Sequence, residues 1–193
     1  MNTRNFPERK SIRLRDYDYS TEGSYFITIC TQDRLELFGK IDHGKMIFNN
    51  VGELVKNIWE SLSNRYGVEL DVFQIMPNHI HGIIHIVGAG FMPARDAGFM
   101  PARPNKRATT RVAPTLGDII GSFKSMVIHQ YINNVENKKW PMFDKRLWQR
   151  NYYEHIIHHE DDLCKIRQYI IDNPKMWDRD RNNPKKRSYQ FLH

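Results

Sequence analysis

The stretch of sequence that most constrains the fold is Met76-Pro77-Asn78-His79-Ile80-His81-Gly82-Ile83-Ile84-His85-Ile86. After the Met-Pro-Asn turn signal, the segment is rich in isoleucine and contains no further proline, which predicts a short apolar strand. Successive side chains of a strand point to opposite faces of its sheet. We therefore expect His79, His81 and His85 to project from the same face.

The first two of these histidines indicate a metal site. Two imidazoles held side by side on a rigid strand can bind one divalent metal ion. A second interpretation remains open, in which the histidines are half-buried and hydrogen-bond to the backbone or to each other. His85 is expected to be structural. A rival cluster consists of His155, His158 and His159. We disfavour it because the extended chain expected through His155 would separate that residue from the following helix.

Length and composition place the chain among globular proteins. Its 193 residues and 23.0 kDa suffice for one well-cored domain with tails, and 40% hydrophobic with 26% charged residues is ordinary for such a domain. No apolar run approaches the roughly 20 residues that cross a bilayer, and the polar, basic N-terminus does not resemble a signal peptide. Cys30 and Cys164 show no metal-type spacing, which favours a reducing cytoplasmic setting.

The charge of the chain indicates an anionic partner. A formal net charge of +7 and a pI near 9.4 favour a nucleic acid. Part of the excess lies in the C-terminal run, where only Asp178 and Asp180 oppose the cations Lys175, Arg179, Arg181, Lys185, Lys186 and Arg187. A solubilising tail and a phosphate-binding arm are both compatible with this run.

Hydrophobic periodicity predicts the order of the elements. We expect a strand at 24–31, a hairpin of 37–41 and 46–48, a helix capped by Asn50 and ended by Gly67, a strand at 68–72, the histidine strand, a helix from Leu116 opened by Thr115 and Asp118, an extended segment at 148–157, and a helix from Glu160 that Pro174 stops. Helices between mainly antiparallel strands predict an α+β fold, a ferredoxin-like (RRM-like) antiparallel sheet with helices packed on one face. The other face would be free to bind a nucleic-acid strand.

One segment stands outside this pattern. Ala89–Arg95 recurs unchanged as Ala97–Arg103, and its glycines and prolines oppose a helix. We expect a flexible, repeat-containing insertion at 88–114. The predicted organisation is a basic leader at 1–12, a single domain at 13–177 that carries the insertion, and a basic tail at 178–193.

A candidate nucleophile lies in the last predicted helix. Tyr169 and Asn173 are spaced i, i+4 and therefore share a helical face. A tyrosine hydroxyl, with an unperturbed pKa near 10, is a weak nucleophile until its deprotonation is assisted. Asn173 could supply a neutral oxygen ligand from the same face. Spacing alone does not choose Tyr169 over Tyr152 or Tyr153, and a tyrosine near the end of a helix is usually a packing residue.

Three blocks of sequence together resemble a known family. The blocks are Pro77–His81, Leu147–His155 and Tyr169–Pro174. They are similar, in this order, to the signature blocks of the single-tyrosine HUH transposases, especially the REP-associated tyrosine transposases. The resemblance runs from about Arg13 to Trp177, with the repeated loop outside it.

The resemblance implies an activity and a set of residues. Such proteins bind single-stranded or hairpin DNA at palindromic repeats and cleave it with Mg²⁺ or Mn²⁺, which leaves a 5′-phosphotyrosine link and a free 3′-hydroxyl. By matching position, Tyr169 would be the nucleophile and His79 and His81 metal ligands. Asn173 would be the third ligand, where relatives in the wider family use glutamine.

Further expectations concern the DNA and the cell. The residues predicted to contact DNA are Arg146, Arg150, Lys175, Arg179, Lys185, Lys186 and Arg187. The expected location is the cytoplasm, associated with the nucleoid, and both a monomer and a homodimer remain open. A repeat-specific DNA-binding protein or repressor that does not cleave is the alternative function. A ferredoxin-like RNA-binding protein is disfavoured because no RNP-like aromatic strand is present.

Overall fold

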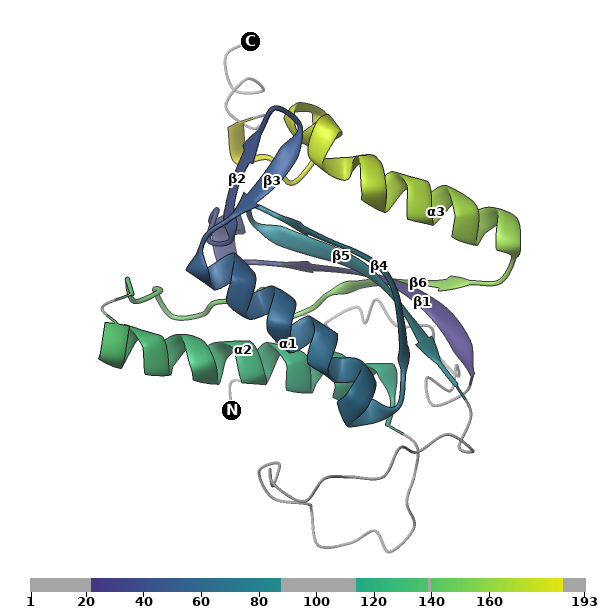
Figure 1. Cartoon of the computed structure of the whole chain (residues 1–193), viewed down its shortest axis with the longest axis horizontal. Helices are drawn as coiled ribbons and strands as arrows, with labels where there is room; N and C mark the ends of the chain where they lie inside the picture. The colour runs from purple at the N-terminus through teal and green to yellow at the C-terminus, as the bar shows by residue number, and fades with distance from the viewer. Residues whose placement is uncertain (1–21, 88–113, 139, 186–193) are drawn as a thin grey trace, which may run out of the picture.

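A four-stranded antiparallel sheet forms the centre of the molecule in this computed structural model, which describes residues 22–87, 114–138 and 140–185 (Figure 1). The spatial order of the strands is β4, β5, β1, β6. Their bounds are Gly23–Cys30 for β1, Glu69–Met76 for β4, His79–Ile86 for β5 and Tyr153–Ile157 for β6. The predicted histidine strand is therefore β5, and it lies in the interior of the sheet between β4 and β1.

The two faces of the sheet carry different helices. α1 (Asn50–Tyr66) and α2 (Leu116–Lys138) lie against one face, where Tyr25, Ile27 and Ile29 of β1 join the main hydrophobic core (Figure 1). Because strand side chains alternate, Phe26 points to the opposite face. There it packs with residues of α3 (Glu160–Asp172) in a smaller apolar cluster.

The α+β class and the antiparallel sheet with helices α1 and α2 on one face are confirmed. The expectation that the other face would lie free needs correction, because α3 packs across it (Figure 1). Leu163 and Ile170 of α3 are buried there against Phe26, Ile83 and Ile157. The apolar stripe of an amphipathic helix must be covered, and these three strand residues provide the matching surface.

The local signals in the sequence act mostly where they were expected. The hairpin forms from β2 (Gly39–Asp42) and β3 (Lys45–Phe48). Gly67 ends α1 in a left-handed conformation with φ of 64°, and Thr115 and Asp118 bond reciprocally at the start of α2. The N-cap of α1 is Asn49 rather than Asn50, because the Asn49 side chain accepts from the amides of Val51 and Gly52.

The segments around the sheet are shorter or more irregular than predicted. We predicted an extended segment at 148–157, but the strand β6 covers only its second half. Before β6, Trp148 forms an isolated bridge with Thr31. A 3-10 turn, η1 (Gln32–Arg34), follows β1, and a second, η2 (Asn173–Arg179), continues the chain beyond α3. Cys30 and Cys164 are free thiols. No described helix combines the length and apolarity needed to span a bilayer. The leader 1–12, residues 88–113 of the insertion and residues 186–193 of the tail lie outside the described residues.

Gly82 of β5 permits the close approach of a buried tryptophan. A Cβ atom at Gly82 would stand 2.5 Å from Cζ2 of Trp59 and 2.8 Å from Cη2. The Trp59 side chain, which is 1% exposed, stacks on Phe73 with ring centroids 4.5 Å apart. The indole ring therefore has no room to move away, and glycine directly after the histidine pair is a packing requirement of the α1 face.

Gly82→Ala should lower the free energy of unfolding by about 1–3 kcal/mol, because the added methyl group overpacks the core against Trp59. Gly121→Ala is the matched control, since nothing lies within 4 Å of a Cβ at that position in α2. Alanine there should stabilise the helix by up to about 1 kcal/mol. Urea unfolding of both variants measures the difference, and equal stabilities would contradict the packing account.

Candidate metal and nucleophile site

The two histidines of β5 meet on the α3 side of the sheet. His79 and His81 are 0% and 1% exposed, and their Nε2 atoms lie 3.0 Å apart. In the register of β5 with β1, His81 is opposite Thr28 and His79 is opposite Cys30. The prediction that both histidines share a face is confirmed, and both Nε2 atoms are directed to the same point.

Asn78 sets the orientation and the tautomer of His79. Its side-chain nitrogen donates to the carbonyls of Arg34 (3.0 Å) and Asn182 (2.8 Å), which identifies the other atom of the amide as the oxygen. That Oδ1 lies 2.8 Å from Nδ1 of His79 and must accept its proton. The Nε2 of His79 is therefore the nitrogen with a lone pair, as a metal ligand requires.

The Thr28 hydroxyl can hydrogen-bond to His81 in either tautomer of the ring. Nδ1 of His81 lies 2.8 Å from this hydroxyl, which can donate or accept. Since Nε2 of His79 is an acceptor, Nε2 of His81 carries the proton of the bond between the two rings. Transfer of that proton to Nδ1, where Thr28 would accept it, frees both Nε2 atoms for a cation without loss of a proton to solvent.

Burial keeps the pair uncharged near neutral pH. Desolvation, with smaller contributions from the His81, Arg34 and Arg181 charges, holds the pKa of His79 well below its usual 6.5. Desolvation and Arg181 lower the pKa of His81 to about 3. Neutral imidazole is the form that binds metals, so protons compete little for this site at physiological pH.

Asp180 completes a group of ligand atoms with the histidine pair. The three potential ligand atoms lie within 4.8 Å of one another, and Oδ2 of Asp180 is 3.5 Å from Nε2 of His79. The Asp180 side chain is only 5% exposed, and its Oδ1 accepts from the amide of Asn182. Among the described residues, no comparable group forms around His155, His158 and His159.

Sequence reasoning missed Asp180, because it counted this residue only as a charge in the basic tail. Two signals were present. Trp177 is a large apolar residue beside the predicted domain boundary, and it packs near the His79 ring with centroids 6.1 Å apart. The turn signal Asn182-Asn183-Pro184 begins two residues after Asp180, and the Asp180 side chain forms a turn with the amide of Asn182.

Asn173 lies in the same region, and its role as a metal ligand stays a prediction. It is 4% exposed, and its Oδ1 has no hydrogen-bond partner among the described residues. Its side chain hydrogen-bonds to Tyr169, so the expected meeting of these two residues across one helical turn occurs. A buried amide oxygen without a partner is an oxygen that a hard cation could use.

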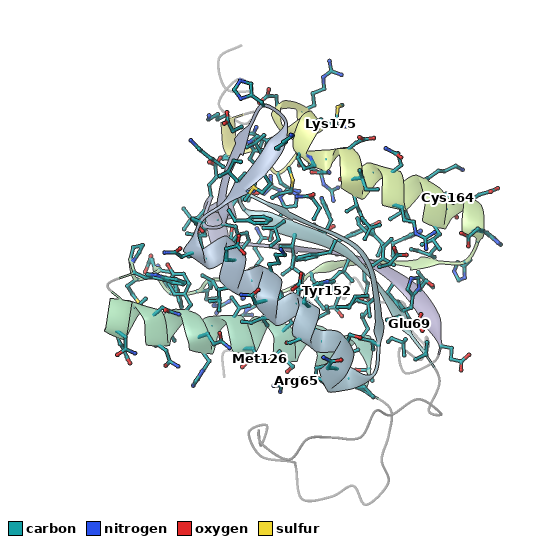
Figure 2. All side chains as sticks on the ribbon, viewed as in Figure 1. Arg65, Glu69, Met126, Tyr152, Cys164 and Lys175 are labelled. Carbon is teal, nitrogen blue, oxygen red and sulfur yellow. The ribbon has the colours of Figure 1, made fainter. Side chains whose placement is uncertain are left out.

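Tyr169 stands at the opening of the site. Its ring packs edge-on against His81, with centroids 5.3 Å apart, and is 49% exposed. Partial burial and the nearby Asp180 carboxylate raise the pKa of Tyr169, while the Asn173 hydrogen bond and Arg181 oppose them. A cleft of about 610 Å³ borders Tyr169, Asn173 and Asp180. Figure 2 labels Cys164 of α3 and Lys175 of η2, the two elements that carry Tyr169 and Asn173.

The residues predicted to contact DNA differ in their positions. Arg179 lines the Tyr169 cleft, and Lys175 pairs with Asp172 at 2.9 Å. Arg146, Arg150 and Lys185 are exposed. Lys186 and Arg187 lie outside the described residues.

His85 is a structural residue, as expected. Its Nδ1 lies 2.6 Å from the Ser24 hydroxyl and its Nε2 is 3.1 Å from Oδ2 of Asp71. The same carboxylate oxygen pairs with Arg167 of α3 at 2.7 Å. This network links β5, β4 and α3 at the end of the sheet remote from the histidine pair.

Comparison with known proteins places the chain in a family. A protein of Haemophilus influenzae, described only as uncharacterized, is 39% identical over 173 residues, which are 89% of this chain and 91% of that protein. The two chains belong to one family. No family model matches the sequence.

The fold has a counterpart among solved structures. A REP-associated tyrosine transposase, solved bound to a REP hairpin, superposes with a TM-score of 0.52 at 16% identity. The likeness covers 86% of this chain and 73% of the transposase. The fold implied by the resemblance of the three sequence blocks is therefore confirmed.

Asp180→Asn should weaken Mn²⁺ binding about tenfold or more, because the carboxylate that lies beside the histidine pair is lost. Asp178→Asn is the matched control, since this exposed aspartate belongs to the same segment. Isothermal titration calorimetry measures the Mn²⁺ affinity of the wild type and of both variants. If Asn173→Ala abolishes binding while Asp180→Asn binds as tightly as the wild type, the third ligand is Asn173 and the assignment to Asp180 is wrong.

The metal-free protein should lose stability as the pH falls from about 6.5 toward 3. In that range the unfolded chain protonates its histidines while buried His79 and His81 resist protonation, so acid favours the unfolded state. Each histidine contributes a slope of roughly 1 kcal/mol per pH unit. Urea unfolding between pH 7 and pH 5 measures it, and the double variant His79→Gln/His81→Gln should show a flatter profile. If the stability of that variant depends on pH as steeply as that of the wild type, His79 and His81 are not the source of the acid sensitivity.

Proposed function

We propose that this protein is a metal-dependent endonuclease and strand transferase for single-stranded DNA, a transposase that acts at palindromic repeats through a 5′-phosphotyrosine link. One observation carries the proposal: the ring of Tyr169 packs on His81, whose Nε2 lies 3.0 Å from that of His79. A half-exposed phenol thus stands beside a buried, neutral pair of nitrogen ligands. The shared fold and the three sequence blocks support the same activity.

The donor set fits a divalent cation. His79 and His81 would hold it together with an oxygen of Asp180 or Asn173, and the mixed nitrogen and oxygen ligands suit Mn²⁺ or Mg²⁺. When bound, the ion would supply electrophilic stabilisation of charge on a phosphate. The four side chains are buried, so they would keep their geometry before DNA arrives.

Tyr169 would make and break the covalent bonds. Its Oη attacks the scissile phosphorus, a new O–P bond forms, and the bond from phosphorus to the 3′-oxygen breaks. The phenolic proton ends on the departing 3′-oxygen, so the products are a 5′-phosphotyrosine and a free 3′-hydroxyl. Because the pKa of Tyr169 is raised, the phenol is protonated at neutral pH and its attack requires removal of that proton.

The surroundings of the site suit a polyanionic substrate. Arg179 and Arg181 line the Tyr169 cleft, and the whole chain carries a net charge of +7. The structural neighbour was solved with a REP hairpin, and we extend hairpin or single-stranded DNA as the partner to this chain. A cytoplasmic, nucleoid-associated location follows from this partner and is part of the proposal.

Tyr169→Phe should abolish covalent capture of DNA and leave DNA binding within about twofold, because only the nucleophilic oxygen is removed while the ring still packs on His81. The substrates are single-stranded oligonucleotides that cover the palindromic sequences of the DNA on either side of the gene, incubated with Mn²⁺; oligonucleotides with the palindrome scrambled serve as the substrate control. Denaturing electrophoresis detects the covalent adduct. Tyr66→Phe, at the far end of α1, is the matched control and should form the adduct normally.

Three outcomes separate the possible functions. An undiminished adduct in Tyr169→Phe would refute the nucleophile. Specific binding of the hairpins by the wild type without any nicking in Mn²⁺ would establish the alternative, a repeat-specific DNA-binding protein or repressor. An adduct that disappears in EDTA and returns with Mn²⁺ would support metal dependence.

A further inference from the structure

A second cleft lies on the same face of the sheet as the histidine pair. It has a volume of about 270 Å³ and is bordered by β1, by the loop that precedes β6, and by Arg34 and Arg181. Thr28 belongs to its wall, and the Thr28 hydroxyl lies 2.8 Å from Nδ1 of His81. Arg181 borders this cleft and the Tyr169 cleft alike. A ligand here would therefore lie next to the candidate metal site.

The loop at residues 149–151 forms a fixed wall of this cleft. The amide of Gln149 donates to the carbonyl of Cys30 at 3.0 Å. Nζ of half-buried Lys124 donates to the carbonyls of Gln149 (2.9 Å) and Asn151 (3.2 Å), and it also reaches that of Arg150. Burial lowers the pKa of Lys124 to about 8, so the ammonium is still mostly protonated at neutral pH and can serve all three carbonyls.

The fixed wall presents unused amide groups. Gln149 and Asn151 both line the cleft, and neither side-chain amide hydrogen-bonds to another described residue. A primary amide offers a donor and an acceptor side by side, the pattern that matches the edge of a nucleobase. The same wall carries Tyr153, which is 43% exposed and could stack on a base.

The charge of the cleft favours a phosphate. Its lining contains Arg34 and Arg181 and no carboxylate, whereas the Tyr169 cleft contains Asp172 and Asp180. The guanidinium of Arg181 lies 5.9 Å from the centroid of the Tyr153 ring. A ligand with a flat polar ring and a negative charge, such as a nucleotide, matches the combination of amides, tyrosine and arginines.

A strained turn connects this cleft to the histidine motif. Asp33 and Arg34 have backbone φ angles of 53° and 57°, values that residues other than glycine rarely adopt. In this conformation the Arg34 carbonyl accepts from Asn78, and the Arg34 guanidinium donates to the carbonyl of Arg181 at 2.6 Å. The strained turn therefore holds Arg34 beside the cleft, and Arg34 in turn contacts the backbone of Arg181.

We propose that this cleft binds one nucleotide of the DNA strand next to the phosphate that is cleaved, and that it reads the base. Gln149 and Asn151 contact the base edge, Tyr153 stacks on the base, and Arg34 and Arg181 hold its phosphate. The assignment rests on the proposed function for the position of the cleaved phosphate. The base-reading property can be measured without cleavage.

Base preference is measured by fluorescence anisotropy with the single-stranded probes dA12, dC12 and dT12 and the full-length protein without metal. The wild type should bind one of the three about tenfold more tightly than another. In Asn151→Ala and in Gln149→Ala the preference should fall to within about twofold, with affinity for the least favoured probe retained. Gln130→Ala, an exposed glutamine of α2 on the opposite face of the sheet, should keep the full preference.

The outcomes distinguish this inference from the proposed function. A wild type without base preference, or a preference that survives in both amide variants, would overturn the base-reading cleft even if Tyr169 forms a covalent adduct. A preference that depends on Asn151 or Gln149 in a protein that forms no adduct would support the cleft and refute cleavage. Thermal unfolding of each variant confirms that the loop substitution leaves the fold intact.

Discussion

The site depends on the buried side chain of Asn78, which joins three segments that are remote in the chain. Its amide bonds to the carbonyls of Arg34 and Asn182 and to the ring of His79. An amide with this many partners at zero exposure has one orientation, and leaving those partners unsatisfied would be costly. The turn after β1, the histidine strand and the segment after η2 are therefore fixed relative to one another by one residue.

Successive side chains of β1 and β5 point to opposite faces of the sheet, and this places the main hydrophobic core and the candidate site on different faces. On one face, isoleucines and aromatic residues pack against α1 and α2 and form the larger core. On the other, the same strands present Thr28, His79 and His81, with only a small apolar cluster beneath α3. Because the two sets of side chains point in opposite directions, the polar site adds no buried polar groups to the main core.

Periodic signals in the sequence predicted the parts of the site that depend on local geometry. The shared face of His79 and His81 follows from the two-residue period of a strand, and the contact of Tyr169 with Asn173 follows from the helical turn. The end of α3 before Pro174 has an equally local cause. These elements needed no knowledge of the tertiary fold.

The parts that sequence reasoning missed depend on contacts between distant segments. Asp180 reaches the histidine pair through the path of the chain after η2. Trp177 and the Asn182-Asn183-Pro184 turn signal indicate packing and a turn there, but they do not specify which strand the segment meets. The packing of α3 on the second face depends on Phe26, Ile83 and Ile157, which come from three different strands. The N-cap at Asn49 rather than Asn50 reflects a choice between adjacent identical residues that spacing does not resolve.

In the proposed function, the neutrality of the histidine pair would couple the binding of the cation to the binding of DNA. A divalent cation between the two rings would meet a single carboxylate within ligand distance among the described residues, with the Arg34 and Arg181 charges nearby. The protein alone would leave that cation only partly compensated, and a DNA phosphate would supply the missing negative charge. By linkage, DNA would tighten the binding of the cation by the same factor as the cation tightens the binding of DNA. Such a site would be loaded chiefly when its substrate is in place.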